Sequence, residues 1–270
     1  MVLNVSNGND VIDKSFVSPS KLGYIFDKFS FLRDDQRSLL LKILSKIEYI
    51  FENEKFGYVI CVAAPTGFGK TIIALAISHL LNKFFDYSCA IFVRTRNQLS
   101  SYVRDSVKFL NELPSVNINK TESCMLVEEA ESWEFLPCSN CEYLSNLKMF
   151  ALYHDKIESR YVNEVVKYIQ ENKIYDPYLI GEQFIHKVWS FCPYYFFKHI
   201  NPGIVVCTYP YLVHPVISKK LIYRPNVVIV DEAHNLEDAF IDRGGGISIE
   251  TIKRAIDELE ELSTRGGFGN

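Results

Sequence analysis

The sequence predicts an α/β fold in which helices flank a parallel sheet, with a mostly helical insertion that carries four cysteines. Four short apolar runs rich in Val and Ile lack the alternation of a half-exposed strand, as expected for strands covered on both faces. A glycine-rich turn joins the first run directly to a helical pattern, and no convincing strand lies between about residues 112 and 202. The four predicted strands are 58–64, 90–95, 203–209 and 226–232.

The amino-acid composition and net charge indicate what class of protein this is. The chain has 270 residues, of which 48% are hydrophobic and 23% charged, which is typical of a folded protein. Its net charge of −4 provides no general attraction to nucleic acid, so any such contact has to be local. We find no signal peptide and no uncharged run of about eighteen residues. We therefore expect a protein without a membrane partner, located in the cytoplasm or, in a eukaryote, the nucleus.

The stretch "APTGFGKT" at 64–71 follows a predicted strand and opens a predicted helix, the context of a phosphate-binding loop. Backbone N–H groups of such a loop surround a phosphate at the positive end of the helix. Lys70 supplies a cation for the β- and γ-phosphates, and Thr71 a hydroxyl for Mg²⁺. The predicted nucleotide-binding residues of the loop are Thr66, Gly67, Phe68, Gly69, Lys70 and Thr71.

The stretch "VVIVDEAHNL" would complete a nucleotide site with that loop, because its carboxylates follow an apolar strand. Ligands of parallel α/β sheets bind at the carboxyl ends of the strands. We expect Asp231 to hold Mg²⁺, directly or through water, and Glu232 to orient and deprotonate an attacking water. Lys70, Asp231 and Glu232 are thus the predicted catalytic residues of an ATPase site.

The seven cysteines fall into two groups. Those at 61, 89 and 207 lie inside apolar runs and are predicted to be buried core thiols. The other four lie in polar segments between the second and third predicted strands: Cys124, Cys138, Cys141 and Cys192.

A redox dithiol leaves two of those four thiols unexplained, and a zinc ribbon favours two tight pairs where this chain has one. Spacing alone leaves an iron–sulfur cluster and a zinc ion as alternatives.

Together, "APTGFGKT" and "DEAH" resemble the superfamily 2 helicases. "FLRDDQRSLLLKI", "RTRNQLSSYVRD", "CTYPYLVHP" and "FCPYYFFKH" resemble segments of the iron–sulfur branch that includes XPD and DinG. The resemblance implies a RecA-like motor domain, ATP and Mg²⁺ as cofactors, and a [4Fe–4S] cluster on the four cysteines. It also implies 5′-to-3′ unwinding of DNA, a role in DNA repair, and single-stranded or forked DNA as the partner.

The resemblance assigns further residues. Gln36 matches the position that reads adenine in these helicases. Thr95 and Arg96 match the motif that touches the DNA backbone, while Tyr194 and Lys198 match positions linked to DNA sensing beside the cluster.

The expected domains follow from these assignments. They are a flexible tail (1–15), a RecA-like motor domain in two parts (16–111 and 203–245), an iron–sulfur domain (112–202) and the start of a truncated arch-like domain (246–270). The chain contains no second RecA-like motor domain, so we expect one in the rest of a longer chain or in a separate subunit. Hydrolysis by this chain alone is expected to be very slow. The alternative is a non-motor subunit that binds ATP and single-stranded DNA.

Overall fold

The computed structural model describes residues 2–5, 18–53, 58–124, 138–201, 203–213 and 225–237. By its internal contacts the chain divides into two units, Met1–Ala233 and His234–Asn270. Every predicted site residue belongs to the first unit, and only 234–237 are described in the second. The predicted final helix at about 248–263 and the rest of the arch-like segment lie outside the described residues.

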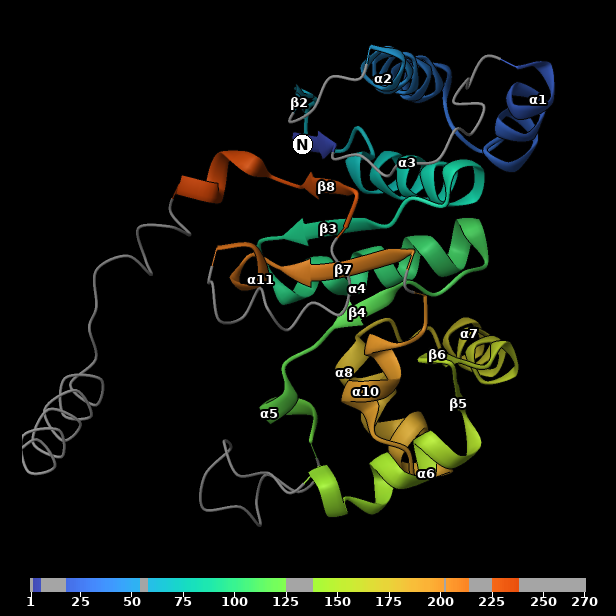
Figure 1. Ribbon diagram of the computed structural model, residues 1–270, viewed down its shortest axis with the longest axis vertical. Helices are drawn as coiled ribbons and strands as arrows, with labels where there is room; N and C mark the ends of the chain where they lie inside the picture. Colours follow the sequence, from blue (N-terminus) through green and yellow to red (C-terminus); the bar gives the residue numbers. More distant parts are fainter. Residues whose placement is uncertain are drawn as a thin grey trace, which may run out of the picture. The chain divides into compact units, whose positions relative to one another are not determined.

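The first unit contains a six-stranded sheet with the order β2-β1-β8-β3-β7-β4 (Figure 1). Strands β8, β3, β7 and β4 run parallel, which confirms the predicted α/β class with a parallel sheet. The strands of this sheet are β1 (Val2–Val5), β2 (Tyr58–Cys61), β3 (Cys89–Val93), β4 (Ser115–Asn117), β7 (Ile204–Thr208) and β8 (Val227–Val230).

Two strands depart from the sequence analysis. Val2–Val5, expected to belong to a flexible tail, pairs antiparallel with both β2 and β8 and so satisfies its backbone groups on both sides. Ser115–Asn117 was placed in a segment without strands, yet it pairs in parallel with β7. β1 is isolated within a polar segment, and β4 is only three residues long with a single Val, so neither is recognised as a strand from sequence.

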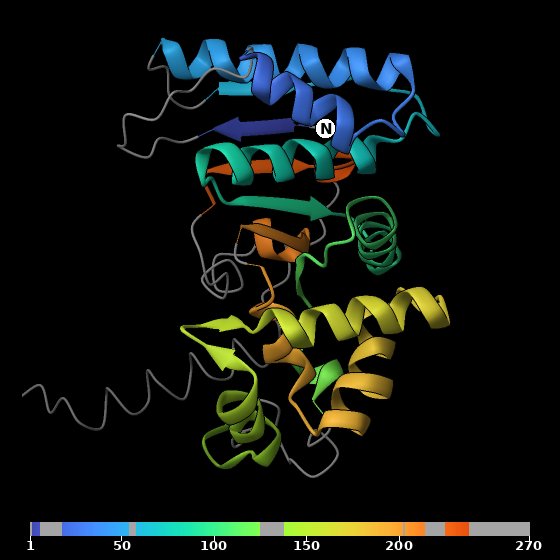
Figure 2. The ribbon, with the colours of Figure 1, turned by 90° about the vertical axis from the view of Figure 1, so that its right-hand side faces the viewer.

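Helices flank this six-stranded sheet (Figures 1 and 2). Helix α3 is apolar on all sides and almost wholly buried, as expected for a helix in the interior of the domain. Helices α3 and α4 both contact β3 and β7. The helices here are α1 (Pro19–Lys28), α2 (Asp34–Glu52), α3 (Lys70–Phe85), α4 (Arg96–Asp105), the π-helix η1 (Ser106–Leu110) and α11 (Pro210–Val213).

The insertion between β4 and β7 is mostly helical, as predicted (Figure 2). Its α10 packs on β4, and the N–H of Asn201 donates to the buried Oγ of Ser115, 2.9 Å away. The described elements are α5 (Lys120–Ser123), η4 (Cys138–Asn140), α6 (Glu142–Phe150), β5 (Leu152–Tyr153), β6 (Lys156–Ile157), α7 (Ser159–Asn172), α8 (Pro177–Ile180), η5 (Gly181–His186), α9 (Lys187–Trp189) and α10 (Pro193–Lys198).

The three cysteines predicted to be buried differ in exposure. Cys89 and Cys207 are buried in β3 and β7, as predicted, but Cys61 is exposed. Strand β2 lies at the edge of the sheet. Val59, which shares a face of β2 with Cys61, is exposed as well, at 56%. The prediction for Cys61 was wrong because an apolar run does not reveal which strand forms an edge.

Candidate functional site

The predicted phosphate-binding loop connects β2 to the first residue of α3, Lys70. Gly67 and Gly69 have φ values of +79° and +91°, in the left-handed region that glycine adopts most readily. A Cβ atom on Gly69 would overlap Nε2 of Gln36, so a larger residue here would displace the Gln36 side chain. The backbone N–H groups of this loop therefore lie at the N-terminal, positive end of α3, where an anion is favoured.

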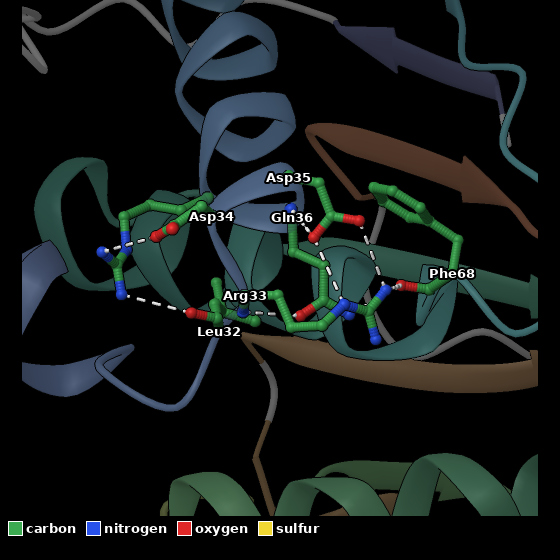
Figure 3. Close-up of polar contacts among 7 residues, drawn as sticks. Leu32, Arg33, Asp34, Asp35, Gln36 and Phe68 are labelled. Atoms are coloured by element: carbon green, nitrogen blue, oxygen red, sulfur yellow. Dashed lines mark hydrogen bonds and ion pairs between the residues drawn. The ribbon is translucent and has the colours of Figure 1, made fainter.

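Gln36, at the start of α2, holds this loop (Figure 3). Its Nε2 donates to the carbonyl of Phe68 at 2.6 Å, and its Oε1 accepts from the N–H of Arg33 at 3.0 Å. Nη2 of Arg33 donates to the same Phe68 carbonyl at 3.1 Å. Gln36 is only 6% exposed, so its amide is committed to protein contacts here. Its assignment as the adenine reader remains a prediction.

Asp231 follows directly after β8, at the carboxyl edge of the parallel strands. It is 5% exposed, and both of its carboxylate oxygens accept hydrogen bonds. Oδ2 accepts from the hydroxyl of Tyr102 at 3.1 Å, and Oδ1 from the N–H of Glu232 at 3.0 Å. Glu232 has a φ of +50°, which turns the chain out of the strand.

An ion pair joins the loop to these carboxylates. Nζ of Lys70 lies 3.1 Å from Oε1 of Glu232 and donates to the carbonyl of Ala64 at 3.3 Å. The two charged side chains are 19% and 30% exposed, so solvent screens the pair only in part. The structure thus brings together the predicted catalytic residues, with Thr71 next to Lys70 on α3.

Sequence analysis missed two tyrosines of this site. Tyr102 lies in α4, and Tyr209 follows β7, where its hydroxyl donates to the carbonyls of both Asp231 and Glu232, the latter at 3.0 Å. Burial, and then the nearby Asp231, raise the pKa of both; that of Tyr209 rises to about 12. Both remain neutral donors at physiological pH. The strand-edge rule could have found Tyr209, but no sequence pattern singles out Tyr102.

The predicted DNA-contacting residues of α4 are engaged within the protein. Thr95 caps α4 in a reciprocal pair with Gln98, whose side chain accepts from the Thr95 N–H at 2.9 Å. The Arg96 guanidinium contacts Glu122, Asp176 and the ring of Tyr178. Their roles in DNA binding remain predictions.

Tyr194 and Lys198 lie together on α10, with Nζ of Lys198 5.6 Å from the centre of the Tyr194 ring. Tyr194 is only 8% exposed, and burial raises its pKa to about 12. A base can stack on this ring only if the surrounding side chains move. DNA sensing by this pair remains a prediction.

The four cysteines of the insertion lie at the ends of short helices. Cys124 follows α5, Cys138 begins η4, and Cys141 and Cys192 precede α6 and α10. The N–H of Cys192 donates to the carbonyl of Tyr143 at 3.1 Å, which joins the beginnings of α6 and α10.

The other three cysteines act electrostatically on Cys192. The pKa of the Cys192 thiol is raised to about 12, chiefly by burial and in smaller part by Cys141, Cys124 and Cys138. Lys120 donates a hydrogen bond to Cys138, which raises the pKa of its ammonium group. A set of four sulfur donors suits either a zinc ion or an iron–sulfur cluster.

Two further observations concern the described residues alone. Among them, the four cysteines included, no group of three or more His, Cys, Asp or Glu side chains is arranged to hold a metal ion. None of their helices is both long and apolar enough to cross a membrane.

Comparisons with known proteins add to this geometry. The DEAD_2 family model matches residues 91–253. The ATP-dependent DNA helicase XPD of Sulfolobus acidocaldarius is 24% identical over 241 residues, which cover 87% of this chain and 38% of that protein. This chain thus spans well under half the length of that relative.

Two solved structures are also similar. One described as an XPD helicase is 26% identical, with a TM-score of 0.45, over 77% of this chain and 33% of its own. A truncated XPD is 26% identical, with a TM-score of 0.40, over 65% of this chain and 48% of its own.

Proposed function

Because the chain belongs to the DEAD_2 family, we propose that it is the ATP-binding half of the motor of an XPD-like, ATP-dependent 5′-to-3′ DNA helicase. The observation that carries the proposal is the Lys70–Glu232 pair at 3.1 Å, which joins the phosphate-binding loop to the carboxylates after β8. A phosphate-binding lysine beside a strand-end carboxylate pair is the arrangement that nucleotide hydrolysis requires.

Each residue of the site has a role in this proposal. The backbone of Gly67–Lys70 and the Lys70 ammonium bind the phosphates, while Thr71 and Asp231 hold Mg²⁺. Tyr102 and the Glu232 N–H each bond one oxygen of Asp231, which fixes the orientation of this carboxylate. Glu232 orients the attacking water and accepts its proton. Magnesium supplies charge neutralisation at the phosphates when it is bound.

The Lys70–Glu232 pair also implies a change of partners during nucleotide binding. A γ-phosphate carries more negative charge than the Glu232 carboxylate and therefore competes with it for the Lys70 ammonium. Once Lys70 turns to the phosphate, Glu232 is released to bind water. A second motor domain supplies the arginines that speed hydrolysis, so turnover by this chain alone is slow.

For the four cysteines, we propose a [4Fe–4S] cluster that holds the insertion in a fixed shape beside single-stranded DNA. The electrostatic effect of Cys141, Cys124 and Cys138 on the Cys192 thiol supports this. The deprotonated sulfur that a cluster requires is disfavoured by burial at Cys192, and iron offsets that cost. Cys124, Cys138, Cys141 and Cys192 are the proposed ligands.

The nucleotide site is tested by measuring Mg·ATP binding to Lys70→Ala and Glu232→Gln variants. Lys70→Ala removes a charged contact to the phosphates, so affinity is expected to fall about 10- to 100-fold. Glu232→Gln is expected to bind Mg·ATP at least as tightly as the parent, since Lys70 loses its competing carboxylate. It is also expected to abolish hydrolysis measured together with the second motor domain.

The exposed pair Lys167–Glu171 offers matched controls, because Lys167→Ala and Glu171→Gln remove the same charges far from the loop in sequence. Both are expected to bind ATP like the parent. Unchanged ATP binding by Lys70→Ala, or full hydrolysis by Glu232→Gln, would show that these roles are assigned wrongly.

The cluster is tested by iron, sulfide and zinc analysis of protein purified without oxygen. About four irons and four sulfides per chain, with a broad absorption near 400 nm, are expected. One zinc ion in a colourless protein would disprove the cluster and leave the nucleotide site untouched.

A further inference from the structure

Arg96 is the first residue of α4, which packs on the motor sheet, yet its guanidinium contacts the insertion. Its Nη1 lies 2.9 Å from Oε2 of Glu122 in α5, and its Nε lies 3.8 Å from Oδ2 of Asp176. The carbon at the centre of the guanidinium lies 3.6 Å from the centre of the Tyr178 ring. One motor side chain therefore joins two separate segments of the insertion.

These two segments are also bonded to each other. The N–H of Asn119 donates to the hydroxyl of Tyr178 at 2.9 Å, and its Nδ2 donates to Oε1 of Glu122 at 3.2 Å. Oδ1 of Asp176 accepts from the N–H of Tyr178 at 2.8 Å and so caps α8. We call Asn119, Glu122, Asp176 and Tyr178 the acidic cradle of Arg96. Cys124 lies only two residues beyond Glu122.

The chemistry of the cradle resembles that of a phosphate. A guanidinium presents its N–H groups in a planar fork that suits carboxylate and phosphate oxygens alike. The Arg96 and Glu122 side chains are 47% and 49% exposed, so a ligand can reach them. Exposed ion pairs contribute little to stability, so a phosphate can exchange with these carboxylates.

We propose that Arg96 is a switch between the acidic cradle and a phosphate of single-stranded DNA, so that strand binding releases the insertion from α4. In the free protein, Glu122 and Asp176 occupy Arg96 and compete with the strand. When a phosphate takes their place, the segment that leads to Cys124 loses its ion pair with α4. This inference rests on the proposed function, because it assumes that the chain binds single-stranded DNA.

Competition predicts that a variant lacking the competitor binds DNA more tightly. We expect Glu122→Gln to bind a fluorescent single-stranded oligodeoxythymidylate about two- to fivefold tighter than the parent, by anisotropy at fixed salt. Glu182→Gln is the matched control. Glu182 is an exposed acid of the same insertion, paired with Lys187 at 2.9 Å, and its loss removes the same charge away from Arg96. We expect less than a twofold change for this control.

The same two substitutions in an Arg96→Gln background separate competition from general charge. Glu122→Gln is expected to have no effect there, because its target is gone. An equal gain in both backgrounds would overturn the switch while leaving DNA binding in place. A parent chain that binds no single-stranded DNA would contradict the proposed function, and the inference with it.

Release of the insertion can be measured separately by amide hydrogen exchange. Amide hydrogen exchange at Asn119 and Ser123 is expected to speed up when the oligonucleotide binds the parent, because the cradle loses Arg96. In Arg96→Gln, exchange is expected to be fast already and unaffected by DNA. Unchanged or slower exchange in the parent on binding would show that Arg96 does not transmit strand binding to the insertion.

Discussion

The proposed nucleotide site and the four-cysteine site are built in opposite ways. At the nucleotide site, the end of β8 and the beginning of α3 place Asp231, Glu232 and Lys70, and each has a hydrogen bond or ion pair within the protein. At the cysteine site, the thiols lie at the ends of short helices in separate segments, and burial raises the pKa of Cys192. The first arrangement is complete without a ligand, whereas the second opposes the thiolate form that a metal needs.

Because of this difference, we expect damage to one site to leave the other intact. Damage to the sheet edge is expected to abolish nucleotide binding and leave the insertion folded. Loss of a metal from the cysteines is expected to unfold part of the insertion and leave the nucleotide site intact.

The largest effect is expected for Cys192→Ser. A cluster that loses one of four thiolates, at the point where α6 and α10 begin, is expected to lose nearly all its iron. Limited proteolysis is then expected to cut within 138–201, while Mg·ATP affinity stays within about twofold of the parent. Cys61→Ser is the control, because Cys61 is an exposed thiol of β2. Full iron content in Cys192→Ser would rule out this cysteine as a ligand.

Gly69→Ala is expected to damage the nucleotide site alone. A non-glycine residue at φ +91° costs about 1–2 kcal/mol. The new Cβ also displaces the Gln36 amide from Phe68, a loss of about 1–3 kcal/mol. We expect weaker Mg·ATP binding and a lower unfolding temperature, with the iron content unchanged.

Gly67→Ala sharpens this prediction. Gly67 has a similar φ of +79°, but its Cβ would meet no atom within 4 Å. Its effect on stability is therefore expected to stay near 1–2 kcal/mol. Equal effects of the two substitutions would mean that contact with Gln36 does not stabilise the loop.

A smaller effect is expected for Tyr102→Phe, which leaves one oxygen of the buried Asp231 without its donor. The free energy of unfolding is expected to fall by about 1–3 kcal/mol. The Mg²⁺ concentration that half-saturates ATP binding is expected to rise, because the carboxylate is no longer held in one orientation. Tyr49→Phe, at an exposed tyrosine of α2, is the control. An unchanged Mg²⁺ requirement would show that Tyr102 serves stability alone.

The smallest effect concerns pH, and the two regions are expected to respond in opposite directions. Burial lowers the pKa of His186 and His199 in the insertion, so the unfolded chain takes up protons first and stability falls below about pH 6.5. Burial raises the pKa of Tyr102 and Tyr209, so the unfolded chain loses protons first and stability falls above about pH 10.

Measuring the thermal unfolding temperature across this pH range checks both the acid and the alkaline dependence of stability. A variant with Gln in place of His186 and His199 is expected to lose much of the acid slope and keep the alkaline one. Each histidine is expected to shift the unfolding temperature by no more than about 3 °C. An acid slope unchanged in this variant would place its origin elsewhere.

The sequence predicts the nucleotide site better than the rest because that site follows local rules. Gly67, Lys70 and Asp231 stand at fixed offsets from a strand end or a helix start, and those offsets are visible in the chain. Tyr102 and the partners of Arg96 come from segments distant in sequence, and only the folded chain brings them together. The edge position of β2, which exposes Cys61, depends likewise on the order of strands.

Strand β3 has a consequence for how the chain is made. It is buried along its whole length, and its two neighbours, β7 and β8, come late in the sequence. The bond between the Ser88 N–H and the Asn226 side chain, at the beginning of this pairing, joins residues 138 positions apart. At about 5–20 residues per second on a ribosome, β3 waits roughly 7 to 27 seconds for both partners. During that time its apolar surface is a target for chaperones, and the whole cysteine segment is synthesised before the sheet can close.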